Sequence, residues 1–251
     1  MSKRETPQQP TSFDRTLTLA ELESQCCPQC RALLPEPIGR LDQIPGQLHL
    51  RRAVVVALTG KHPITFVGAG AALPDALAFG RIGRRYGLTA YATMPCPCGN
   101  LGDVYLACTC TPAALADWRA RPSFRAALST DMVVEAALTS VEQRLAHQRG
   151  RRGESDEQLL AEAAAARERP RPNDDLDGAG QRLLAAAIRQ LQLSTEQIAR
   201  LLPLAQSITQ LAGAQAIAPV HLAEALQYRS RLVAIAELLE PDTPDLGASE
   251  R

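Results

Sequence analysis

The chain has 251 residues, of which 45% are hydrophobic and 22% charged, so it can bury a core in one large or two small domains. Its formal net charge is zero and 4% of its residues are aromatic, which argues against a global attraction to nucleic acid and against base-stacking surfaces. Seven cysteines, no apolar signal segment and no run as long as a membrane span predict a soluble, cytoplasmic protein without a membrane partner.

Residues 1–40 are expected to form a flexible arm, because their start is polar and repeats Pro and Gln. The arm contains the run C-C-P-Q-C, in which Cys27 and Cys30 have the spacing of a zinc half-site or a thioredoxin-type redox pair. The redox interpretation lacks the βαβ context of such proteins. A metal knuckle shared with later cysteines and an idle surface turn both stay open.

Residues 41–150 are predicted to form an α/β core. Apolar residues at helical spacing predict a helix over residues 47–58, and the run P-I-T-F-V predicts a buried strand over residues 63–67. This strand enters a glycine turn, which is followed by a helix over residues 73–86 and a second strand over residues 88–93. Strand, turn, helix and strand in this order are typical of a parallel βαβ unit.

A cysteine loop follows at residues 95–111, with the pair Cys96 and Cys98 at its start and the pair Cys108 and Cys110 at its end. Between the pairs, Gly99, Asn100, Gly102 and Asp103 favour turns that bring them together. Four converging thiolates are the ligand set of a structural zinc site, so we predict zinc here, with Cys27 and Cys30 as a second candidate set. The alternatives are reduced thiols or a disulfide, since C-x-C is less diagnostic than C-x-x-C.

Three further elements are expected before residue 150. Thr111 and Pro112, a hydroxyl cap and a Pro at the first helical position, begin a helix that extends to about residue 121. Residues 131–138 are a predicted strand, and residues 140–149 a helix that ends in the linker R-G-R-R-G.

Residues 154–240 are predicted to form a helical domain. Ser155 with Gln158, and Ser194 with Gln197, are capping boxes that mark two helix starts. The expected helices form a small bundle and span residues 155–169, 178–192, 195–211 and 219–239. The remaining residues, 241–251, are expected to be a disordered tail.

Four stretches of the chain resemble the magnesium-chelatase-like AAA+ ATPases, in particular the ComM-type competence helicase branch. They are LDQIPGQLHLRRAVVVALTGKHPITFVG, the cysteine block PCPCGNLGD…CTCTP, the segment GES…AARER, and LQLSTEQIARLLPLAQSITQLAGAQAI…HLAEALQYR. Together they cover most of residues 41–230, and the cysteine block and HLAEALQYR are the specific parts.

The resemblance also shows where this chain departs from the family pattern. In the family, the turn after the first strand is a P-loop whose amides, Lys and hydroxyl hold phosphates and magnesium. Here the turn contains Gly68 and Gly70, while Pro74 and Asp75 stand at the Lys and hydroxyl positions. This degenerate P-loop is therefore not expected to bind a cofactor.

Other family positions are changed as well. The long insert with the acidic Walker B strand is missing between Phe79 and Met94, and Met94 replaces the sensor Asn. The family's Asp-Arg pair corresponds to Leu128-Ser129, so the trans-acting arginine is missing, and the lid arginine is replaced by Glu196. Phosphoryl transfer depends on positioned charge and metal, so no enzyme activity and neither ATP nor magnesium is expected.

The resemblance thus implies an α/β, mostly helical protein, with a shrunken AAA+-like core followed by a lid-type helical bundle. We expect a non-catalytic protein-binding or regulatory module with a protein partner such as an active AAA+ ATPase. His62 and His221 are expected to have structural roles.

Two alternatives are weighed against this interpretation. An ATP-binding subunit with an altered P-loop has only Gly68 and Gly70 in its favour. A zinc-containing DNA-binding protein would use the cysteine loop as a knuckle, and its phosphate contacts would be Arg81, Arg84, Arg85, Arg149, Arg151 and Arg152.

Overall fold

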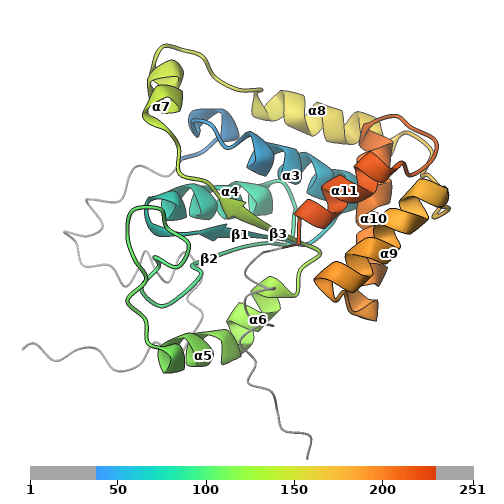
Figure 1. Cartoon of the computed structure of the whole chain (residues 1–251). Helices are drawn as coiled ribbons and strands as arrows, with labels where there is room; N and C mark the ends of the chain where they lie inside the picture. Colours follow the sequence, from blue (N-terminus) through green and yellow to red (C-terminus); the bar gives the residue numbers. More distant parts are fainter. Residues whose placement is uncertain (1–37, 230–251) are drawn as a thin grey trace, which may run out of the picture.

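A computed structural model describes residues 38–229 (Figure 1). The predicted arm up to residue 37, with Cys27 and Cys30, lies outside the described residues. So does the predicted tail at residues 241–251. These predictions therefore stay predictions.

A three-stranded parallel sheet lies at the centre of the α/β part, in the order β2-β1-β3. Its strands are β1 (Ile64–Gly68), β2 (Ala90–Thr93) and β3 (Met132–Ala136). Every residue of β1 is buried, as a near-continuous apolar run requires of a central strand covered on both faces. The predicted βαβ unit and the later strand are confirmed.

The helices of this part agree with prediction except for one. Helix α3 (Leu48–Gly60), α4 (Leu73–Arg85) and α5 (Pro112–Ala120) lie where they were expected, and α4 packs on β1 and β2. Rings of Phe66 and Phe79 meet between α4 and the sheet, with centroids 5.5 Å apart. Helix α6 (Pro122–Leu128) was not predicted, because one Pro and a single apolar turn give a weak periodic signal.

The C-terminal part is helical, as predicted. Ser155 and Ser194 each accept the expected N–H bond of a capping box. The elements are α7 (Val141–Gln148), α8 (Asp156–Arg167), α9 (Gly178–Leu191), α10 (Thr195–Leu211) and α11 (Pro219–Gln227). The described residues thus form a mostly helical α/β structure with a small parallel sheet.

Helix α11 ends earlier than predicted. The prediction continued it toward residue 239, but Gln227 is its last helical residue. The Tyr228 N–H donates back to the carbonyls of Ala225 and Leu226, and the Tyr228 carbonyl accepts the Val133 N–H at 2.8 Å. The chain leaves the helix here because its backbone pairs with β3.

One continuous hydrophobic core joins the sheet to the C-terminal helices. Helices α8 and α10 both pack on α3, so the predicted ranges 41–150 and 154–240 share this core. Buried His62 spans the junction, with Nδ1 3.0 Å from Asp131 Oδ2 and Nε2 2.9 Å from Ser207 Oγ. Since His62 lies two residues before β1 and Asp131 directly precedes β3, α10 docks at the amino ends of the strands.

His221 is also structural, as predicted. It is buried, its Nδ1 lies 2.9 Å from Thr209 Oγ1, and it accepts the Ala218 N–H at 3.1 Å. Among the helices of residues 38–229, none combines the length and apolar composition needed to cross a membrane.

Candidate metal centre

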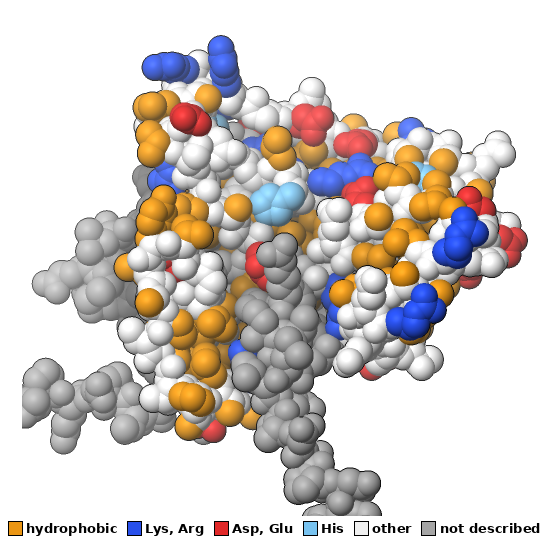
Figure 2. Space-filling view, in the orientation of Figure 1, with side chains coloured by type: hydrophobic (Ala, Val, Ile, Leu, Met, Phe, Trp, Pro, Cys, Tyr) orange, Lys and Arg blue, Asp and Glu red, His pale blue; other side chains and the backbone are white. Residues whose placement is uncertain are grey.

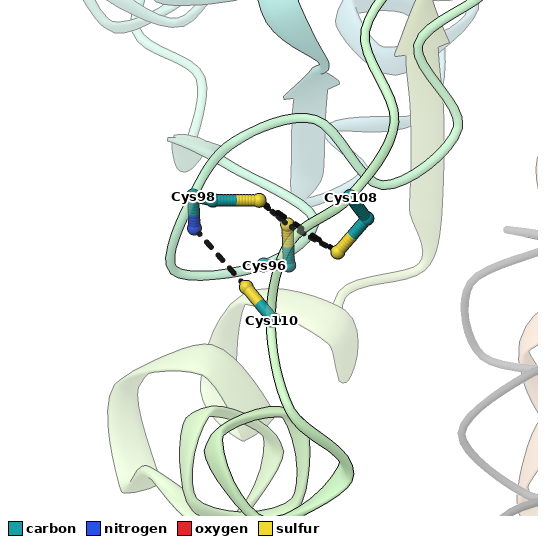
Figure 3. Close-up of side chains that lie close together, drawn as sticks. All are labelled: Cys96, Cys98, Cys108 and Cys110. Atoms are coloured by element: carbon teal, nitrogen blue, oxygen red, sulfur yellow. Dashed lines mark hydrogen bonds between the residues drawn. The ribbon is translucent and has the colours of Figure 1, made fainter.

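The cysteine loop leaves the carboxyl end of β2 and returns to α5, and the structure brings its four predicted cysteines together (Figure 3). All four sulfur atoms lie within 4.8 Å of one another. Cys98 Sγ is 3.4 Å from Cys96 Sγ and 3.7 Å from Cys108 Sγ. A zinc ion with Zn–S bonds of about 2.3 Å holds tetrahedral sulfurs about 3.8 Å apart. The sulfur positions therefore fit a metal of this kind.

Glycines and backbone amides shape the loop around the sulfur atoms. Gly99 and Gly102 have φ values of 81° and 86°, a left-handed conformation that L side chains rarely adopt. The Leu101 N–H donates to Cys96 Sγ at 3.3 Å, and the Cys98 N–H donates to Cys110 Sγ at 3.4 Å. Such donors favour the thiolate, which is the form that ligates metal.

The thiols differ in their readiness to ionise. Hydrogen bonds from the backbone of Asn100 and Thr109 lower the pKa of Cys98 to about 5, so its thiolate forms readily at neutral pH. Burial raises the pKa of Cys96. A bound metal requires all four ligands to be deprotonated. Metal binding here would therefore release the proton that the Cys96 thiol holds when no metal is bound.

The loop also contacts the turn after β1. The Gly70 N–H donates to the Gly99 carbonyl at 2.9 Å, and a β-carbon added at Gly70 would overlap the Asp103 carboxylate. Asp103 Oδ1 accepts the N–H groups of Tyr105 and Leu106 at 2.8 and 2.7 Å. These bonds, and a weaker one from Ala71, lower the pKa of Asp103 and keep it anionic. A fixed negative charge thus faces the turn.

Asp75, which stands at the hydroxyl position of the degenerate P-loop, is hydrogen bonded to other parts of the fold. Its Oδ2 accepts bonds from Gln47 Nε2 at 2.7 Å and from Thr139 Oγ1 at 3.3 Å. Burial raises the pKa of Asp75 despite these bonds. Pro74 occupies the first turn of α4 and offers no N–H. Asp75 therefore connects α4 to the segments that precede α3 and follow β3.

Glu196 and Leu128-Ser129, which stand at the two family arginine positions, lie far from this turn. Glu196, at the start of α10, pairs with Arg200, whose guanidinium also donates to the Ser129 carbonyl. Ser129 lies near the amino end of β3, whereas Gly68 and Gly70 lie at the carboxyl end of β1. The structure thus separates Glu196 and Leu128-Ser129 from the turn by the length of the sheet.

Sequence reasoning missed three residues of this region. Asp103 looked like a turn residue only, and nothing in the sequence marked Gln47 or Thr139 as partners of Asp75. The left-handed conformation of Gln47, with φ at 54°, aims its amide at Asp75 and at the backbone of Ala137. Such a contact depends on segments that are distant in sequence, so no local signal indicates it.

Residues 130–229 match the family model described as "Magnesium chelatase, subunit ChlI C-terminal". No curated protein matches the chain. The matched segment begins before β3 and includes α7, so it starts earlier than the helical domain predicted at residue 154. The match relates the C-terminal part of this chain to the magnesium-chelatase-like family.

Proposed function

We propose that the protein is a non-catalytic, ComM-like relative of the magnesium-chelatase-like AAA+ ATPases that acts as a protein-binding or regulatory module. In this proposal the region of residues 41–150 is a reduced AAA+ core. The observation that carries it is the turn after β1, where the Asp103 carboxylate lies against Gly70 and where Pro74 and Asp75 stand in place of a phosphate-binding Lys and hydroxyl.

Electrostatics supports this proposal. A carboxylate beside the turn repels a phosphate group that approaches it, most strongly at low salt. Asp103 keeps its charge at neutral pH because backbone N–H groups lower its pKa. Each missing charge-assisted phosphate contact removes roughly 1.5–3 kcal/mol of binding free energy. Both effects oppose a bound triphosphate.

A structural zinc ion is part of the proposal. Cys96, Cys98, Cys108 and Cys110 would hold it, and four protein sulfurs leave no open coordination position for catalysis. Bound zinc would supply a cross-link that holds residues 95–111 in one conformation. The chain's own contribution is to place Asp103 against Gly70 at the base of that loop.

The test is isothermal titration of the zinc-loaded full-length protein with Mg-ATP. We expect no binding heat up to millimolar nucleotide, and micromolar affinity would overturn the proposal. Affinity capture from native cells should recover a specific protein partner, such as an active AAA+ ATPase. A consistently solitary protein would contradict the regulatory role without bearing on the nucleotide result.

A zinc-containing DNA-binding protein is the second candidate, because the exposed loop after α7 carries Arg149, Arg151 and Arg152. Figure 2 shows basic side chains gathered over this part of the molecule. Elsewhere on the same face acidic and basic groups are interspersed, and Arg84 and Arg85 donate to backbone carbonyls of the fold. This candidate requires duplex binding that falls steeply with salt.

A further inference from the structure

A groove of about 230 Å³ lies between the amino end of β3 and the helices α10 and α11. Its volume is below the roughly 300–1,000 Å³ of typical small-molecule sites. Polar residues such as Asp131 and Arg200 form its rim. Apolar side chains form its floor, namely Val133, Leu193, Leu201, Leu204, Ala225 and Leu226. Such a floor suits aliphatic side chains of a peptide better than a polar cofactor.

The chain itself continues from the wall of this groove. Tyr228 and Arg229 line it, and 22 residues follow Arg229 in the sequence (251 − 229). The match to the magnesium chelatase domain also ends at residue 229, so this extension lies beyond the matched domain. The segment after Arg229 therefore starts beside the apolar groove.

The sequence of the extension complements the groove. Residues 230–240 read S-R-L-V-A-I-A-E-L-L-E, and Leu232, Ile235, Ala236 and Leu239 recur at i, i+3, i+4 and i+7. That spacing predicts a helix with one apolar face. An isolated helix of this length is marginal in water, so it requires an apolar surface to pack against.

The exit point of the chain is fixed at the groove. The Tyr228 carbonyl accepts the Val133 N–H at 2.8 Å, and the Tyr228 hydroxyl donates to Glu224 Oε1 at 3.1 Å. Tyr228 is 6% exposed, so this anchor is firmly packed. With almost no linker between anchor and apolar face, the effective concentration of the extension at the groove is high.

We propose that residues 231–239 dock in this groove of the same molecule through the face formed by Leu232, Ile235 and Leu239. The docked segment covers the floor formed by α10 and α11. A partner helix with the same apolar spacing would have to displace it. The extension is thus an internal competitor for a protein-binding surface.

Photo-crosslinking of the full-length protein tests this placement. A benzoylphenylalanine at position 235 should crosslink within the monomer to peptides that contain residues 128–133, 193–204 or 225–229. The same probe at position 247, beyond the apolar segment, should give no groove crosslinks. Crosslinks elsewhere on the chain would overturn the proposal. Crosslinks found only in a dimer band would also overturn it, and would identify a second copy as the occupant.

Hydrogen exchange of the same full-length chain gives an independent readout. Ile235→Asp should raise the exchange rate of residues 193–204 about threefold or more, because the cover over Leu201 and Leu204 is lost. Leu246→Asp is the matched control, with the same change outside the segment and no expected effect. An unchanged rate in Ile235→Asp would contradict docking even if that variant folds normally.

Discussion

Asp103 puts a carboxylate against the backbone of Gly70, and its ionisation is secured by the N–H groups of Tyr105 and Leu106. Asp103 therefore places a negative charge beside the turn after β1. Asp75 contributes differently, because it is buried and hydrogen bonded to Gln47 and Thr139. Asp103 thus acts on anions that approach the turn, whereas Asp75 acts on the stability of the folded protein.

Asp103→Asn should increase residual pyrophosphate binding several-fold at low salt, since it removes a like charge beside the turn. The asparagine keeps an oxygen that accepts the Tyr105 N–H, so the loop is expected to hold. Titration calorimetry measures the change. Asp117→Asn, an exposed change of the same kind on α5, serves as control. Equal affinities for the two variants would show that Asp103 does not repel anions.

Asp75→Asn tests the buried carboxylate through pH. Burial raises the folded-state pKa of Asp75 above its ordinary value of 3.8, so the folded state binds the proton more tightly than the unfolded state does. Its contribution to stability is therefore full below pH 3.8 and is lost as pH rises through the raised value. Asp75→Asn should flatten this decline and raise the melting temperature at pH 7. A steeper decline in the variant would reverse the assignment.

At the scale of elements, the conformation of the cysteine loop depends little on hydrophobic packing. Val104, Tyr105 and Leu106, at its tip, are 76%, 80% and 55% exposed, so the loop buries little apolar surface of its own. Its order comes from the turns at Gly99 and Gly102 and from the sulfur cluster. A bound metal would supply the missing constraint.

Cys108→Ser with Cys110→Ser should abolish stoichiometric zinc, which we expect at one ion per chain, as read by metal analysis. Zinc present at about 100 times its Kd adds about 2.7 kcal/mol to folding, so the variant should lose about that much stability. Cys27→Ser with Cys30→Ser is the matched control for the second candidate set. If zinc falls equally in both variants, the four-sulfur site is not self-sufficient.

At the scale of the whole molecule, α3 packs against both the sheet and the C-terminal helices. Ile208 of α10 is fully buried in the shared cluster, which also includes Phe66 of β1. The two predicted ranges are therefore expected to unfold together, because neither keeps its core when the other leaves.

Ile208→Ala should lower the free energy of unfolding by about 2–5 kcal/mol, the usual range for deleting a buried aliphatic side chain. Loss of Trp118 fluorescence and loss of helical circular dichroism should still coincide in one transition. Val220→Ala, at a side chain 67% exposed on α11, should change stability by less than about 0.5 kcal/mol. Two separate transitions would mean that the halves fold independently.

The sequence by itself determined most of the local structure of this protein. Capping boxes at Ser155 and Ser194, the apolar run of β1 and the Thr111-Pro112 start are encoded within a few residues of where they act, so their elements were predictable. The spacing of the four cysteines likewise indicated their convergence. Helix α6 was not predictable, because its single apolar turn gives little periodic signal. The end of α11 was not predictable either, since a hydrogen bond between Tyr228 and β3 overrides helical periodicity there.

Only the tertiary structure decided where these parts meet. Asp103 meets Gly70, Asp75 meets Gln47 and Thr139, and α10 docks at the amino ends of the strands. The groove beside Arg229 likewise arises from β3, α10 and α11 together. These contacts join residues tens of positions apart, and their energy depends on burial and charge that exist only after the chain has folded. Periodicity and turn chemistry report local preference and carry no information about such pairs.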